Sequence, residues 1–161
     1  MEIHEKAPVV ARAETQIAAD PETVWRLLSD FEKWPTWKHD VRSMALHGSL
    51  ASGSVFVWKA GPGTIRSTLQ AVDPQRAIAW TGSTMGIKAI DSFRLEPRDD
   101  GGTLVREAES WEGLLVRLFA GRLRRTLQTS LETGLADLKA EAERRVLATA
   151  RQQKEQGRRA L

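Results

Sequence analysis

Apolar and polar residues follow two different spacings along the chain. Between residues 8 and 112, short stretches in which apolar and polar residues alternate are separated by turn residues, which is typical of antiparallel strands. Beyond residue 112 the apolar residues recur at helical spacing, which is typical of one long amphipathic helix. This order predicts an α+β domain in which a sheet precedes a long helix.

Seven strands are expected from the alternating stretches. They cover residues 8–18, 41–46, 54–59, 64–72, 77–81, 87–95 and 103–111. Gly61-Pro62-Gly63 and Asp99-Asp100-Gly101-Gly102 are turn sequences, and the second is a strong hairpin signal. The short connections predict that neighbouring strands pair in antiparallel fashion.

Two short helices are expected between the first two strands. Asp20 is suited to cap the first of them and Pro21 to occupy its first position, because a cap accepts backbone N–H groups and proline lacks one. That helix ends near Asp30. Residues 31–34 predict a further helical turn, which Pro35 ends.

The long helix is expected over residues 114–147. Its apolar stripe consists of Leu115, Leu118 or Phe119, Leu123, Leu127, Leu131, Leu135, Leu138, Ala142 and Val146. An antiparallel sheet with one apolar face needs a cover, and this helix is long enough to supply it. We therefore predict one domain over residues 1–147, a curved sheet around a helix, followed by a polar, frayed tail over residues 148–161.

Composition excludes several classes of protein and site. The chain of 161 residues has no cysteine, so it has no disulfide and no thiolate metal site, and its three histidines lack metal-ligand spacing. We expect neither a metal nor another cofactor. No apolar run approaches the roughly 18 residues that cross a bilayer, so a soluble, cytoplasmic protein is expected. No nucleic-acid-binding motif is recognisable, and no nucleic acid partner is expected.

Basic residues are unevenly distributed although the net charge is only +3. Arginines crowd residues 117–125 and recur in the C-terminal tail. Such a stretch is explained either by a solvated helix face or by attraction to an anionic membrane.

The sequence resembles the START-like (SRPBCC) superfamily, which includes polyketide cyclases/dehydratases and lipid-transport proteins. The similar stretches are "ADPETVWRLLSDFEKWPTWKHDV", "GSVFVWKAGPGTIRSTLQAVDPQRAIAWTG", "GGTLVREAESWEG" and "SLETGLADLKAEAER", within about residues 10–145. The resemblance implies a helix-grip fold around a hydrophobic ligand cavity. It leaves the function open, because the superfamily contains binders, transporters and enzymes.

Strand alternation predicts which side chains face such a cavity. The candidate ligand-binding residues are Trp34, Trp37, Phe56, Trp58, Ser67, Leu69, Ile78, Trp80, Ala89, Phe93, Glu107, Trp111, Phe119 and Leu123. Most are apolar, as a lipid-like or aromatic ligand requires, although each of them also fits an ordinary core. Of the two tryptophans that flank Pro35, one is expected in the core and the other at the mouth of the cavity.

Asp91 and Glu109 are the candidate catalytic residues. A hairpin that turns at Asp100-Gly101 places Asp91 opposite Glu109 and Phe93 opposite Glu107. Two neighbouring carboxylates in an apolar cavity raise the pKa of one of them, which is the basis of general acid–base catalysis. A register slip of one residue would instead turn them toward water.

We expect the protein to bind a hydrophobic small molecule such as a lipid, polyketide or isoprenoid, and transport of that molecule is a further hypothesis. The alternative is a cyclase/dehydratase-type enzyme that uses the inward carboxylates, although the absence of tyrosine removes a usual acid. A third class is a protein-interaction module with an exposed apolar patch. The oligomeric state is not predicted.

Overall fold

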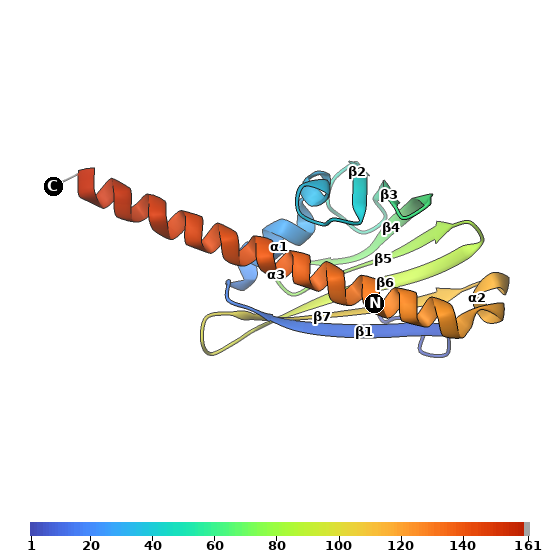
Figure 1. The fold of residues 1–161 in the computed structure, drawn as a ribbon. Coiled ribbons are helices and arrows are strands. Elements are labelled where there is room, and N and C mark those ends of the chain that lie inside the picture. The colour runs from blue at the N-terminus through green and yellow to red at the C-terminus, as the bar shows by residue number, and fades with distance from the viewer. Residues whose placement is uncertain (160–161) are drawn as a thin grey trace.

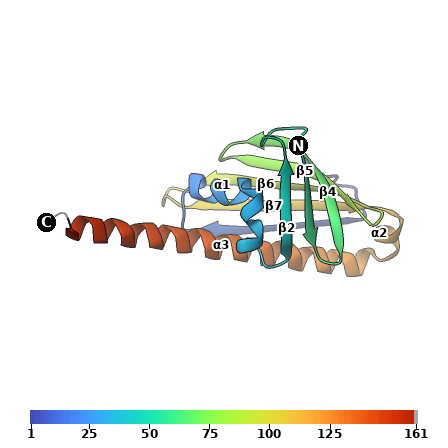
Figure 2. The ribbon, with the colours of Figure 1, turned by 90° about the horizontal axis from the view of Figure 1, so that it is seen from above.

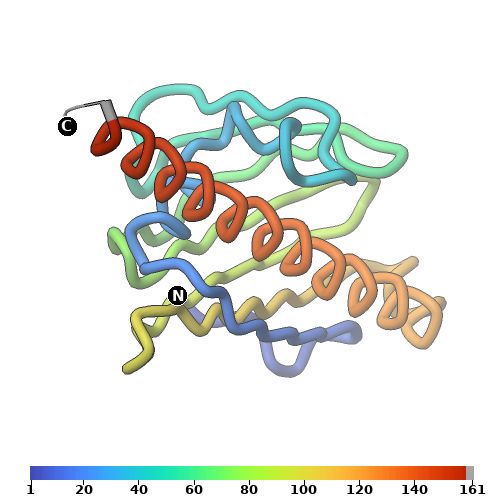
Figure 3. Tube along the Cα trace, turned by 60° about the vertical axis from the view of Figure 1, so that its left-hand side comes forward, coloured from blue at the N-terminus to red at the C-terminus, as the bar shows by residue number. Residues whose placement is uncertain are grey.

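The computed structural model describes residues 1–159, in which a seven-stranded antiparallel sheet curves around one long helix (Figure 1). Figure 3 shows this helix lying across the sheet, with β2–β4 on one side of it and β1 and β7 on the other. The elements are β1 (Val9–Ile17), α1 (Pro21–Ser29), the 3₁₀ helix η1 (Phe31–Thr36), β2 (Val41–His47), β3 (Val55–Ala60), β4 (Gly63–Asp73), β5 (Ala77–Thr84), β6 (Ile87–Pro97), β7 (Thr103–Glu112), α2 (Leu114–Leu118) and α3 (Ala120–Arg159). The predicted helix-grip fold is confirmed.

The strand order of the sheet is β1-β7-β6-β5-β4-β3-β2. Strands β2 to β7 form a meander of consecutive antiparallel neighbours, and β1 joins the free edge of β7. The pairing of β6 with β7 brings Asp91 opposite Glu109 and Phe93 opposite Glu107, as the turn at residues 100–101 predicts. Because side chains alternate along a strand, this register turns all four toward the same face of the sheet.

The segment between β1 and β2 follows its sequence signals except at Pro35, which lies inside the 3₁₀ helix η1 (Phe31–Thr36) and does not end it. Helix α1 starts at Pro21, and Asp20 caps it, with its Oδ1 accepting a hydrogen bond of 2.7 Å from the Thr23 N–H. The 3₁₀ helix η1 contains Pro35, and the Trp34 indole N–H donates to the Leu28 carbonyl oxygen at 3.2 Å. This bond ties η1 to the end of α1 and directs the Trp34 ring into the interior.

The single helix predicted over residues 114–147 differs from the structure at both ends. The backbone leaves helical geometry at Phe119, which separates the short α2 from α3. Helix α3 then continues to Arg159, beyond the end of the apolar stripe, and projects past the sheet (Figure 2). Residues 148–158 are exposed and are mostly Ala, Arg, Gln, Lys and Glu, which extend an existing helix. Residues 160 and 161 of the predicted tail lie outside the described part.

Two clusters of apolar side chains fill the space between the sheet and α3. The first, which we call the aromatic cluster, includes Leu28, Phe31, Trp34, Trp37, Phe56, Leu69, Ile78, Trp80, Phe93, Val105, Leu135 and Leu138. The second, which we call the aliphatic cluster, consists of Val9, Ala11, Val116, Leu127 and Leu131, with the partly exposed Ile87, Trp111, Ala120 and Leu123 packed against it. The candidate site lies at the boundary between these two clusters.

Candidate functional site

Three carboxylates face inward from two neighbouring strands of the sheet, β6 and β7. Asp91 lies on β6, and Glu107 and Glu109 lie on β7. Asp91 is 7% exposed and Glu107 5%, and Glu109 is partly exposed. The predicted pairing of Asp91 with Glu109 is therefore confirmed as geometry, while the catalytic role of the pair stays a prediction.

The carboxylates separate the aromatic cluster from the aliphatic cluster. Along β7, Val105 belongs to the aromatic cluster and Trp111 packs against the aliphatic one, with Glu107 and Glu109 between them. Along α3, Leu135 and Leu138 cover the aromatic cluster, whereas Leu127 and Leu131 belong to the aliphatic cluster. The three carboxylates thus lie between two apolar clusters, next to the part of α3 between Leu131 and Leu135.

Burial controls the ionisation of these groups. It raises the pKa of Asp91 well above its ordinary value, and the charges of Glu109 and Glu107 add to the effect. Burial likewise raises the pKa of Glu107 well above the ordinary range. The pKa of Glu109 rises to about 7, also through burial, and is held there by the Trp111 indole N–H, which donates to Glu109 Oε1 at 2.6 Å and favours the carboxylate.

Lys38 supplies a positive charge to this cluster. It follows η1, is buried, and its Nζ lies 3.3 Å from Asp40 Oδ1. The charge of Lys38 lowers the pKa of Asp91, of Glu107 and of Glu109, in each case against the larger opposing effect of burial. We call Asp91, Glu107, Glu109 and Lys38 the polar cluster.

Gly134 makes room for the lysine. A Cβ atom at this position of α3 would collide with Lys38 Nζ. Glycine in a helix interior costs about 1 kcal/mol relative to alanine, so its presence on the buried stripe of α3 needs such a reason. The close approach of the lysine to the helix backbone is that reason.

Three buried side-chain polar atoms have no hydrogen-bond partner among the described residues. They are Asp91 Oδ1, Glu107 Oε2 and Trp37 Nε1. Buried polar groups in folded proteins are nearly always paired, so unpaired ones need an explanation, and a bound molecule is one of them. Two of the three are acceptors when the carboxyls are ionised, and the indole is a donor.

Solvent reaches the inner face of the sheet at the end nearest to α2. The inward-facing Ile87, Ala89 and Trp111 are partly exposed, and so is Leu123 on the first turns of α3. On β3, Trp58 is also partly exposed, with its indole N–H donating to Ser67 Oγ at 3.0 Å. The inner face is therefore closed at the aromatic cluster and accessible near the aliphatic cluster.

Not every candidate residue lies where the sequence suggests. Phe119 is 56% exposed, because the break between α2 and α3 turns it away from the sheet. Trp34 and Trp37 are both buried in the aromatic cluster, with ring centroids 5.3 Å apart, so neither is at a mouth. The other candidates face inward: Phe56, Trp58, Ser67, Leu69, Ile78, Trp80, Ala89, Phe93, Glu107, Trp111 and Leu123. Their ligand-binding roles stay predictions.

Sequence reasoning missed Lys38 and Gly134. Lys38 follows an irregular 3₁₀ segment, where no periodicity indicates the direction of a side chain. Gly134 did carry a signal, because a glycine on the apolar stripe of a helix indicates close approach of another group.

A hollow of about 470 Å³ lies on the outer face of the sheet, opposite α3. Its lining includes Arg66, Thr68, Thr81, Ser83, Lys88 and Ser110, whose side chains alternate with those of the inner face. It is therefore distinct from the predicted cavity under α3.

The described residues contain neither a metal-binding cluster nor a membrane-spanning helix. Within residues 1–159, no three histidine or acidic side chains are arranged to hold a metal ion. None of the helices in that part of the chain has the length and apolar character needed to span a bilayer.

Comparison with solved structures gives the fold. A hypothetical protein from Helicobacter pylori superposes with a TM-score of 0.77 at 14% identity, covering 86% of this chain and 90% of that one. The Zhui aromatase/cyclase from Streptomyces sp. R1128 gives 0.73 at 18% identity, covering 85% and 94%. A START superfamily protein from Mycobacterium smegmatis gives 0.67 at 18% identity, covering 84% and 97%.

A protein-family model identifies the family to which the chain belongs. No curated protein matches the sequence. The family model described as "Polyketide cyclase / dehydrase and lipid transport" matches residues 8–143, which include every strand, the polar cluster and most of α3. The chain therefore belongs to the polyketide cyclase / dehydrase and lipid transport family.

Proposed function

We propose that the protein binds a hydrophobic small molecule between the sheet and α3, with a polar group of the ligand directed at the polar cluster. The family and the fold both fit hydrophobic ligand binding. The observation that carries the proposal is the pair of buried, unpartnered oxygens Asp91 Oδ1 and Glu107 Oε2 between two apolar clusters. A hydroxyl group or another hydrogen-bond donor on an otherwise apolar ligand would satisfy them.

The apolar body of the ligand is assigned to the end near α2. The aromatic cluster is closely packed, with ring centroids 4.6 Å apart for Phe31 and Phe56 and 5.7 Å for Trp80 and Phe93. Ile87, Trp111 and Leu123 are partly exposed and apolar, so covering them with a ligand removes apolar surface from water. The ligand would therefore extend from the polar cluster toward α2, with the aromatic cluster as its floor.

Native mass spectrometry of protein purified from cells tests the proposal directly. We expect a co-purified molecule with an apolar body and at least one hydrogen-bond donor. The variant Glu107→Met removes an acceptor, and we expect at least about a tenfold loss of affinity for the recovered molecule, with stability unchanged or increased because an apolar side chain replaces a buried carboxyl with an unpaired oxygen.

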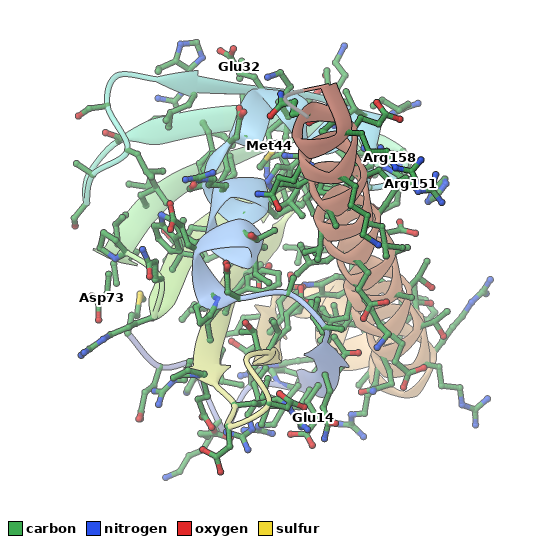
Figure 4. The ribbon with its side chains drawn as sticks, turned by 90° about the vertical axis from the view of Figure 1, so that its left-hand side faces the viewer. Glu14, Glu32, Met44, Asp73, Arg151 and Arg158 are labelled. Atoms are coloured by element: carbon green, nitrogen blue, oxygen red, sulfur yellow. The ribbon has the colours of Figure 1, made fainter. Side chains whose placement is uncertain are left out.

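Glu32→Met is the matched control for that variant. Glu32 is an exposed glutamate on η1, and Figure 4 labels it at the edge of the molecule. Retention of the recovered molecule by Glu107→Met as well as by the control would contradict the proposal. So would recovery of the native protein from cells without any bound molecule.

An acid–base enzyme is the second candidate, favoured by the ionisation of Glu109. A carboxyl with a pKa of about 7 exchanges its proton at neutral pH, and burial raises the pKa of Asp91, which lies opposite it, well above its ordinary value. In a dehydration, Glu109 would take the proton from carbon and Asp91 would protonate the departing hydroxyl group, so that water leaves.

Asp91→Asn separates the two candidates. For an enzyme, the molecule recovered with Asp91→Asn is heavier by one water than the molecule recovered with the native protein, and adding native protein converts it. Recovery of the same molecule from both proteins, unchanged in mass after the native protein is added, would support binding without catalysis.

A further inference from the structure

Helix α2 forms an exposed apolar surface at one end of the molecule. Leu114, Leu115, Leu118 and Phe119 are between 56% and 75% exposed, and Met85 in the β5–β6 turn is 70% exposed. Only Val116 of this helix is buried, in the aliphatic cluster. Figure 1 shows α2 at the end of the molecule opposite to the C-terminus, where it protrudes beyond the strands. We call these five exposed residues the α2 patch.

The surroundings of the α2 patch are basic. Residues 113–131 contain Arg117, Arg122, Arg124 and Arg125 and no acidic residue. Arg117 and Lys88 also line a hollow of about 390 Å³ beside Leu114. Glu112 lies in the same hollow, and its carboxylate is hydrogen-bonded to His4.

We propose that the α2 patch docks the protein on an anionic phospholipid membrane. Exposed leucine and phenylalanine side chains on a protruding tip enter the interface between lipid headgroups and chains, which removes their apolar surface from water. The arginines beside them contact the lipid phosphates, and such contacts contribute about 1 kcal/mol for each basic residue near the surface.

Charge complementarity favours this partner over a second copy of the chain. A symmetric dimer through the α2 patch would bring the arginines of two copies together, and like charges in contact oppose association. An anionic membrane instead presents negative charge to these arginines, over an area much larger than the α2 patch. The membrane proposal does not depend on the ligand proposal, because docking requires only the outer surface of α2 and its arginines.

Sedimentation with lipid vesicles tests the proposal on the full-length protein. We expect binding to vesicles of equal parts phosphatidylcholine and phosphatidylglycerol, weak binding to phosphatidylcholine alone, and loss of binding in high salt. The double variant Leu114→Ser/Leu118→Ser should weaken binding at least about tenfold. Reversing two charges in Arg122→Glu/Arg125→Glu should weaken it by about tenfold or more.

Two controls match these variants at the other end of α3. Leu147→Ser replaces a leucine that is 62% exposed, and Arg151→Glu reverses the charge of an arginine that Figure 4 labels on the projecting part of α3. Both should bind vesicles like the native protein. Circular dichroism should show that all variants keep the fold, since the altered side chains are exposed.

Three outcomes would overturn the proposal: no binding of the native protein to anionic vesicles, equal binding to neutral vesicles, or unchanged binding of both α2-patch variants. A fourth is dimerisation of the native protein in sedimentation velocity that Leu114→Ser/Leu118→Ser abolishes, because the patch would then belong to a second copy.

Discussion

The two ends of the space under α3 are filled in opposite ways. At one end the aromatic cluster packs rings from η1, β3, β5 and β6 against one another, and Phe31, Trp34, Phe56 and Trp80 meet mostly edge to face. At the other end the aliphatic cluster has five buried members, and the side chains around it are partly exposed. The aromatic end therefore carries most of the stability, whereas the aliphatic end remains accessible.

The part of the interior that stabilises the fold therefore differs from the part that is accessible to a ligand. Regions that bind ligands are commonly drawn from the less stable part of a protein, because entry of a ligand requires local opening. The polar cluster lies at the boundary between the two ends. A ligand that enters near α2 passes the aliphatic end and then reaches this cluster. Substitutions at the two ends should therefore differ in their effect on the free energy of unfolding.

The largest expected effect is at the aromatic end. Trp80→Ala removes a buried ring that contacts Phe31, Trp34, Phe56 and Phe93, and we expect a loss of about 3–5 kcal/mol in the free energy of unfolding. Trp111→Ala, at the accessible end, should cost about 1–2 kcal/mol because that ring is already partly exposed. Urea unfolding of the two variants measures the difference. Equal losses would contradict the division.

A smaller effect is expected at the boundary, and it depends on pH. The folded pKa of Glu109, about 7, lies above its unfolded value of about 4.5, so the folded state binds more protons between these pH values. The stability that Glu109 contributes is complete below pH 4.5 and is lost as pH rises through 7. The side chain in Glu109→Gln stays neutral and still accepts a hydrogen bond from Trp111. At pH 8 the free energy of unfolding of this variant should therefore exceed that of the native protein by about 2 kcal/mol.

Chemical unfolding at pH 5 and at pH 8 checks this prediction. The stability difference between Glu109→Gln and the native protein should be larger at pH 8 than at pH 5. Glu32→Gln, which changes an exposed carboxyl, provides the control. A difference that shrinks toward pH 8 would show that the pKa of Glu109 is not raised in the folded protein.

The smallest expected effect on stability is that of Gly134→Ala. Alanine favours the helix by about 1 kcal/mol, and displacement of the flexible end of Lys38 offsets part of this gain, so the net change should stay within about 1 kcal/mol. The titration of Glu109 should nevertheless shift to higher pH, because the lysine that lowers its pKa moves away. Carbon-detected NMR of the carboxyl groups measures the shift.

Gly121→Ala is the matched control, because no atom lies within 4 Å of a Cβ at that position of the same helix. It should leave the titration of Glu109 unchanged. A Glu109 pKa that is the same in Gly134→Ala as in the native protein would mean that Lys38 does not act on this carboxyl.

The strands and their register were predictable because local signals determine them. The Asp100-Gly101 turn places Asp91 opposite Glu109, and two-residue alternation then turns both inward. Alternation alone also identifies the inner face, including Phe56 and Trp80, since one face of each strand is apolar. The residues that form a turn and the alternation of side chains along a strand are both set by short segments, so they can be recognised in a single sequence.

Other features depend on contacts that no local pattern encodes. The direction of Lys38 depends on the approach of residues 38–39 to α3, and the burial of Trp37 depends on a cluster that includes residues from distant strands. The exposure of Phe119 follows from a break in the helix at a residue whose sequence context continues the helical pattern. The open end of the interior likewise results from the packing of α3 across the sheet.

The strand order also has a consequence for the time course of folding. Strands β2 to β7 can form hairpin by hairpin, whereas β1 has no partner until β7 is in place, and Val9 pairs with Trp111 roughly 100 residues along the chain. We expect β1 to join after the folding barrier, so that Ala11→Gly accelerates unfolding and leaves the refolding rate nearly unchanged. Stopped-flow refolding measures both rates, and a refolding rate that falls in proportion to the lost stability would place β1 in the nucleus instead.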